Sequence, residues 1–106
     1  MSEQIPAETD RESLLRREYH QQTGRIPWVE LQSYYARGSV IRVSTELDLV
    51  EVAVQLGLDN TACFEAWITE GGIAAPSENE ALFWYESQAV LWAVVAAPWV
   101  LVQEHR

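Results

Sequence analysis

The stretch that decides the fold is residues 89–102, which read AVLWAVVAAPWVLV and contain no charged residue. Its valines are β-branched and its two tryptophans are aromatic, so the stretch favours a covered β-sheet over a helix. Pro98 cannot donate a backbone hydrogen bond to a sheet and would break a helix. We therefore expect two short, largely buried strands with a turn or a bulge at Pro98.

The composition is that of one small acidic domain. The chain has 106 residues, 48% of them hydrophobic and five of them Trp, which is enough for a single core. Its formal charge is −9 and it contains no Lys. This charge argues against general attraction to nucleic acid or to an anionic membrane.

Three features predict a soluble cytoplasmic protein. Cys63 is the single cysteine, which excludes an internal disulfide and fits a reducing compartment. Residues 1–10 lack the basic start and the apolar run of a secretion signal. The apolar run 89–102 is shorter than the ~20 residues that a membrane-spanning helix needs.

The charges are unevenly distributed. Residues 1–42 hold six Arg and six acidic residues, whereas residues 43–105 hold ten acidic residues and no Arg or Lys. The simpler interpretation is a solvated acidic surface that keeps a Trp-rich protein in solution. The alternative is a surface for a basic partner.

Residues 1–24 are expected to form a loose tail and one helix, and residues 25–106 a single domain. The sequence DRESLLRREYHQQ predicts a helix from Asp10, its N-cap, to Gln22, with Gly24 after its end. The apolar side of this helix is narrow and predicts weak docking, exchange with a neighbouring chain, or an arm. It consists of Leu14, Leu15 and Tyr19.

A second helix is predicted from Pro27 to Gly38, followed by a strand over residues 39–44. Pro27 suits the first helical position, and Trp28, Leu31 and Tyr35 form the buried face at helical spacing. In the strand, Ile41 and Val43 lie on one face and Arg42 on the other.

Residues 46–56 are predicted to form a helix that Thr45 and Asp48 open as a capping box and Gly57 ends. Alternating valines leave a strand as the alternative, but the polar residues fall on one helical stripe. These are Asp48, Glu51, Gln55 and Asp59.

A further helix is expected after Asp59 or Asn60, ending at Gly71 and Gly72, with Cys63 as a small core residue. Its predicted inner face is Phe64, Trp67 and Ile68. After an extended link, a capping box of Ser77 and Glu80 starts a helix that runs through Ser87. Residues 82–85, LFWY, are bulky on more than one side of it, so part of this aromatic surface is a candidate contact for a partner.

Together these elements predict an α+β fold, with four to five helices around a short, mainly antiparallel sheet. Residues 51–67 also resemble a helix-turn-helix, and the element order is similar to that of a winged helix. Its second helix carries Glu65 and Glu70 but no Arg or Lys, which favours a structural helix pair over DNA recognition.

The chemistry-bearing residues do not support an enzyme. His20, His105 and Cys63 have no catalytic sequence context, and Asp48 with Glu51 lacks a third metal ligand. No phosphate-binding loop, HExxH or CxxC occurs, so we expect no cofactor. Arg37 and Arg42 flank Gly38 and either bind an anion or pair with nearby acids.

Three segments carry a resemblance to a known family: RIPWVELQSYYARGSVIRV, LDLVEVAVQL and LWAVVAAPWVLVQE. Over roughly residues 25–104 the chain resembles the uncharacterised bacterial proteins of domain of unknown function family 2288. The resemblance implies a small bacterial protein and no particular activity.

The leading hypothesis is a small cytoplasmic interaction or regulatory module that binds another protein. The alternative is a winged-helix regulator whose Arg residues contact DNA. Membranes are not expected as partners, and a homodimer is left open. The candidate partner-binding residues are Trp84, Tyr85, Glu65, Glu70, Arg37 and Arg42.

Overall fold

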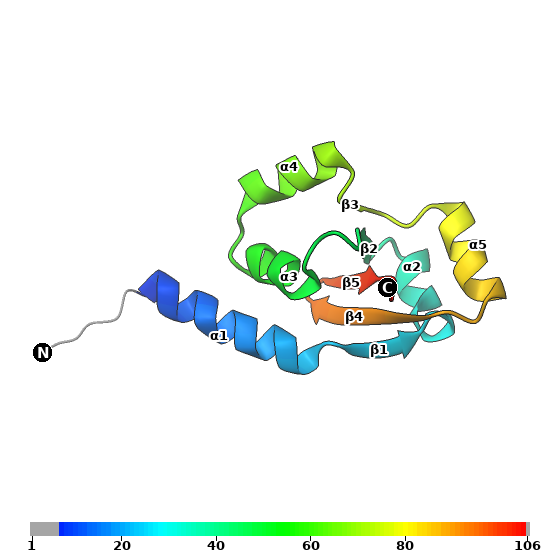
Figure 1. Ribbon diagram of the computed structural model, residues 1–106, viewed down its shortest axis with the longest axis horizontal. Coiled ribbons are helices and arrows are strands. Elements are labelled where there is room, and N and C mark those ends of the chain that lie inside the picture. Colours follow the sequence, from blue (N-terminus) through cyan, green and yellow to red (C-terminus); the bar gives the residue numbers. More distant parts are fainter. Residues whose placement is uncertain (1–6, 106) are drawn as a thin grey trace, which may run out of the picture.

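A five-stranded mixed sheet with helices on both faces organises the fold (Figure 1). The computed structural model describes residues 7–105. It confirms the α+β class and the mainly antiparallel sheet, because β2 and β5 form the one parallel pair between strands in the described chain. The elements in chain order are α1 (Ala7–Gln22), β1 (Gly24–Pro27), the 3-10 helix η1 (Trp28–Leu31), α2 (Gln32–Ala36), β2 (Val40–Val43), α3 (Leu49–Gly57), α4 (Thr61–Glu70), β3 (Ile73–Ala74), α5 (Glu78–Glu86), β4 (Val90–Ala96) and β5 (Trp99–Gln103).

The predicted strand pair is the centre of the sheet. The strands follow the order β1-β4-β5-β2-β3, and β4 and β5 form an antiparallel hairpin in which Val95 pairs with Val100. Pro98 lies in the turn between them and is joined to Ala97 by a cis peptide bond. Leu101 and Val102 of β5 are completely buried. The prediction of buried strands around residues 89–102 is therefore confirmed, with Pro98 in a turn.

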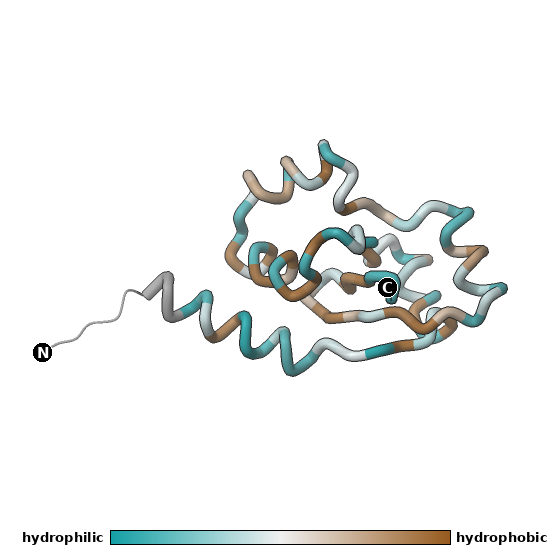
Figure 2. The backbone as a smooth tube through the Cα atoms, viewed as in Figure 1, coloured by the Kyte–Doolittle hydropathy of each residue, from teal (hydrophilic) through white to brown (hydrophobic). Residues whose placement is uncertain are grey.

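Alternating residues of the strands face two separate apolar clusters. On one face, Leu91 and Val100 pack with Trp28 of η1 and Trp84 of α5. On the other, Val94 and Leu101 pack with α3. Figure 2 shows that the residues of α3 are mainly hydrophobic and those of α1 mainly hydrophilic. In the chain as described, no helix has the length and apolar character needed to cross a membrane.

Helix α1 begins at Ala7, earlier than expected, so Asp10 lies inside the helix and is not its N-cap. No Gly or Pro interrupts Ala7–Gln22, so the helix has no reason to start later. The predicted tail falls largely on residues 1–6, outside the described residues. Helix α1 packs against α3, where the Arg11 side chain donates to the Gly57 carbonyl oxygen at 2.9 Å.

The segment around Pro27 differs from the prediction. Pro27 is the last residue of β1, an unpredicted strand, and pairs with Val90. Its ψ of 139° is extended, and the Trp28 N–H continues the pairing by donating to the Ala89 carbonyl. Helical structure therefore begins at Trp28, as a 3-10 turn that continues into α2. Gly38, with φ of +77°, follows the helix as predicted.

Helix α3 is confirmed as a helix, but the predicted capping box is wrong. Asp48 is itself the N-cap, and its carboxylate accepts hydrogen bonds from the N–H groups of Val50 and Glu51. This arrangement satisfies two N–H groups that the helix leaves free and moves its start to Leu49.

Gly57 is the last residue of α3, whereas the turn after the helix is made at Asp59, with φ of 59°. A Cβ atom on Gly57 would lie 3.1 Å from Tyr19 Oη and 3.2 Å from Leu15 Cδ1. A side chain at position 57 would therefore press against Tyr19 and Leu15 where α1 approaches α3.

Helices α4 and α5 have the predicted caps. Asn60 caps α4, Gly71 ends it, and the box of Ser77 and Glu80 opens α5. The inner face of α4 is narrower than expected, because Ile68 is 59% exposed and Cys63 is only half-buried. The short linkers at both ends of α4 leave Phe64 and Trp67 as its contacts with the core.

Candidate functional site

The most distinctive surface surrounds α5. Nine large apolar side chains are exposed in the described chain, and four of them belong to η1 and α5. We call these four residues the α5 surface. They are Val29, Leu82, Phe83 and Tyr85.

The sequence of α5 explains why it exposes so much apolar area. Successive residues of a helix are about 100° apart, so four adjacent bulky residues cannot all face the sheet. Trp84 points inward and is 1% exposed, whereas its neighbours Phe83 and Tyr85 are 62% and 57% exposed. The helix is therefore anchored by one aromatic residue and presents the others to solvent.

The Trp84 side chain is held in place by a ring contact and a hydrogen bond. Its ring meets that of Trp28 edge to face, with centroids 4.9 Å apart. Its indole Nε1 donates to Glu104 Oε2 at 2.8 Å, just beyond the end of β5. Trp28 also packs against Tyr35 of α2. Trp28 therefore packs against both α2 and α5 and fixes their positions relative to each other.

Two hollows lie on either side of Tyr85. The larger, of about 480 Å³, lies between Pro27 and Val29 on one wall and Tyr85 and Glu86 on the other. The second, of about 300 Å³, lies over the Trp28 ring, between α2 and α5. Since Tyr85 lines both, the two hollows are neighbours, and we call the two together the α2–α5 groove.

The charge lining the groove has one sign. Glu86 is the charged residue of the larger hollow and Glu78 that of the second, and neither hollow is lined by Arg or Lys. An apolar groove with carboxylates at its edge suits a ligand that is apolar and positively charged.

The predicted site residues do not form one site: those of α5, the two Arg residues and the two Glu residues of α4 lie in different places. Trp84 is buried and belongs to the core, so the exposed surface of α5 is formed by Tyr85 and its other neighbours. Arg42 of β2 reaches α5, where its Nε lies 3.2 Å from Glu80 Oε2 in an ion pair. Arg37 at the end of α2 lies over the Tyr34 ring at 4.8 Å. Both Arg residues therefore have local contacts.

Glu65 and Glu70 are exposed on α4, which stands apart from α5 in Figure 1. They are not part of the α2–α5 groove. The acidic residues that line the groove, Glu78 and Glu86, were not selected from the sequence.

Val29 and Tyr34 are also exposed apolar residues that were not identified from the sequence. The predicted buried stripe of Trp28, Leu31 and Tyr35 is correct, and Val29 and Tyr34 are the apolar residues of the same segment that lie outside it. That mismatch was the available signal for an exposed apolar surface.

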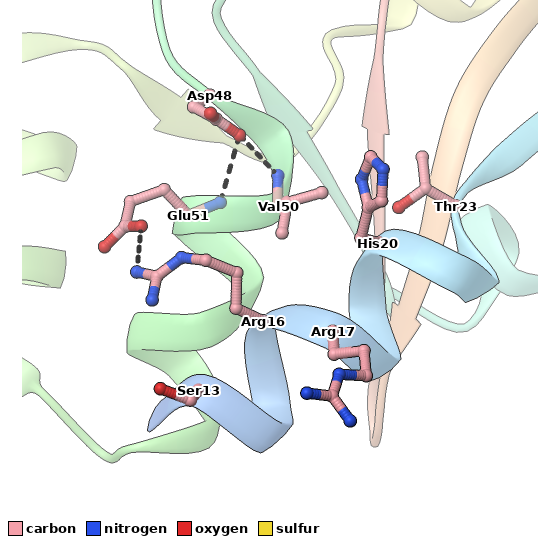
Figure 3. Close-up of a pocket in the computed structure, with 8 residues that line it drawn as sticks. All are labelled: Ser13, Arg16, Arg17, His20, Thr23, Asp48, Val50 and Glu51. Atoms are coloured by element: carbon pink, nitrogen blue, oxygen red, sulfur yellow. Dashed lines mark hydrogen bonds and ion pairs between the residues drawn. The ribbon is translucent and has the colours of Figure 1, made fainter. Parts of the chain in front are cut away.

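A separate, polar hollow lies between α1 and the start of α3, away from the α2–α5 groove (Figure 3). Arg16 pairs there with Glu51, and with Glu12 at 3.1 Å, while Glu51 also accepts from Gln55 at 2.7 Å. The hydrogen bond from Arg16, with a further one from Gln55, lowers the pKa of Glu51. The hydrogen bond to Glu51 is also the main cause that raises the pKa of Arg16.

These polar contacts join α1 to α3. Figure 3 shows Asp48 bonded to the first turn of α3 and Arg17 turned away from Glu51. Within residues 11–105, no group of three or more His, Cys, Asp or Glu residues is placed to hold a metal ion. The contacts account for the docking of α1 and define no reacting group.

Comparison with known proteins identifies a family of unknown function and a similar solved structure. Residues 14–104 match a family described as a protein of unknown function, DUF2288, which confirms the resemblance seen in the sequence. The NMR solution structure of PA1075 from Pseudomonas aeruginosa is similar, with 38% sequence identity and a TM-score of 0.75. The alignment covers 100% of this chain and 92% of that one. No curated protein matches.

Proposed function

The chain belongs to the DUF2288 family of proteins of unknown function, and from its surface we propose that it is a small cytoplasmic module that binds another protein. The observation that carries this proposal is the α5 surface. Four large apolar side chains stay exposed there although the chain has a well-formed core beneath them. Exposed apolar surface of this kind is typical of binding sites.

The composition of the surface supports a protein partner. Aromatic residues contribute large contact areas at a small cost in side-chain entropy and are enriched among the residues that dominate binding energy. Phe83 and Tyr85 are of this type. The buried residues Trp28 and Trp84 pack together beneath this surface and hold η1 and α5 in place. The surface is therefore ordered before a partner binds.

Nucleic acid is a less favoured partner. The chain carries a formal charge of −9, and α4, the helix that would read DNA in a winged-helix regulator, has Glu65 and Glu70 but no Arg or Lys. Carboxylates on a reading helix would repel phosphates. The Arg residues of the first half would have to supply all of the attraction, and Arg16 and Arg42 are already paired with acids.

The proposal is tested by capture from a native lysate with the full chain as bait. Wild type is expected to retain a partner in stoichiometric amount, and Tyr85→Ser is expected to lose it. The matched control is Ile68→Ser on α4, because Ile68 is 59% exposed, close to the 57% of Tyr85. Equal capture by all three baits, or capture of nothing over a range of salt concentrations, would refute the proposal.

A further inference from the structure

We infer that the α2–α5 groove recognises a basic amphipathic helix of a partner protein. The inference rests on the proposed function and specifies the chemistry of the partner. The groove presents two apolar hollows separated by Tyr85, which suits two apolar side chains projecting from one face of the same segment.

The walls of the groove determine the conformation of its occupant. They are formed mainly by residues of η1, α2 and α5, and Pro27 of β1 is the one strand residue that lines either hollow. The groove therefore offers few backbone partners to an extended chain. The nearby edge strand β1 ends at Pro27, which has no N–H to donate to an added strand. A helix satisfies its own backbone hydrogen bonds, so it fits these walls better.

The charge of the groove determines the chemistry of the occupant's polar face. Glu78 and Glu86 line the two hollows, and neither hollow is lined by Arg or Lys. Lys or Arg residues flanking the apolar anchors would meet these carboxylates, whereas a second copy of this chain brings a net charge of −9 to the same surface.

The test uses a designed helical peptide of about 16 residues, long enough to form a helix in contact with a protein. Leu residues occupy one face at i, i+3 and i+4 spacing, and Lys residues occupy the remainder. A matched peptide replaces each Lys with Glu. Binding to the full chain is measured by fluorescence anisotropy at physiological salt, and the contact surface is mapped by NMR chemical shifts.

Two pairs of substitutions separate groove recognition from general attraction. The double variant E78Q/E86Q removes two charges at the groove and is expected to weaken binding about fivefold. The control E65Q/E70Q removes the same charge from α4 and is expected to change binding less than about twofold, because Glu65 and Glu70 do not line the groove and salt screens charges outside it. Leu82→Ser, at a 54% exposed position, is expected to weaken binding at least tenfold without unfolding the chain.

The inference is supported if the Lys peptide shifts resonances of η1, α2 and α5 and the Glu peptide does not. It is overturned if the two charge variants weaken binding equally, or if the shifts lie elsewhere. A Tyr85-dependent dimer in sedimentation would also overturn it, in favour of a second copy. If Tyr85 still governs partner capture while the Lys peptide fails to bind, this inference fails and the proposed function stands.

Discussion

The two faces of the sheet are covered to different extents. On the α3 face, Val52, Ala53 and Val54 are at most 1% exposed, and α1 lies over the helix that contains them. On the α5 face, Leu91 and Val100 are buried, but Val95 is 54% exposed and the covering helices themselves expose Val29 and Tyr85. One face thus has a second layer supplied by the same chain, and the other does not.

The difference lies in where α1 goes. A single helix can cover only one side of the sheet, and Gly57 with the pair of Arg16 and Glu51 directs α1 to α3. The α5 face therefore keeps the apolar surface that a partner could cover. Changes on each face should have different consequences, and the largest effect is expected beneath the groove.

Replacing Trp28 with Ala should cost about 3–5 kcal/mol of unfolding free energy, because it removes a buried ring that contacts Trp84 and Tyr35. Tyr85→Ala, in the same groove, should cost within about 0.5 kcal/mol because its side chain is largely solvated. Urea denaturation measures both. If the two variants lost similar amounts of unfolding free energy, Tyr85 would belong to the core and not to an exposed surface above it.

A smaller effect is expected where α1 meets α3. Gly57→Leu places atoms where Tyr19 and Leu15 now lie, so it should cost about 1–3 kcal/mol through overpacking. Adding Tyr19→Ala should recover part of this loss, as a double-mutant cycle would detect. If Gly57→Leu were neutral and the second change did not rescue it, α1 would not be packed closely against α3 in solution.

The smallest effect concerns the ion pair in Figure 3. Because the pKa of Glu51 is lowered in the folded state, its contribution is fully present above the ordinary Glu pKa and disappears as the pH falls through the folded value. The pair is partly exposed, so the contribution should be about 0.5 kcal/mol at neutral pH.

Glu51→Gln should therefore be less stable than wild type at pH 7 and should approach it at pH 3. Unfolding curves of both proteins at several pH values measure the difference. A difference that does not vary with pH would mean that the lost stability comes from packing and not from the charge of Glu51.

Much of the fold could be predicted because local signals agreed with tertiary structure. The run around Pro98 has one role, as buried strands, and Ser77 with Glu80 forms the box that its spacing suggests. The errors occurred where two local roles compete. Pro27 suits either a helix start or an edge strand, and the Ala89 carbonyl, 62 residues away in sequence, decides between them.

The site was harder to predict because it depends on which side chains the core leaves outside. The sequence indicated that the aromatic residues of 82–85 exceed what one helix face can bury, and Tyr85, one of the candidate partner-binding residues, is exposed. Trp84 was chosen with it, because only the contact with Trp28 shows which ring turns inward. The groove also needs η1 and α2 beside α5, a proximity that no local pattern encodes.

The order of the strands has a consequence for how the chain folds. Strands β1 and β2 do not pair with each other, because β4 and β5 lie between them in the sheet. Val40 of β2 therefore pairs with Val100 of β5, which is far along the chain. Such distant pairings slow folding. During synthesis, β2 can pair with β3 on one edge, but its other edge stays unpaired until β5 emerges, and β1 stays unpaired until β4 emerges. The final hairpin is therefore the step that commits the nascent chain to its sheet.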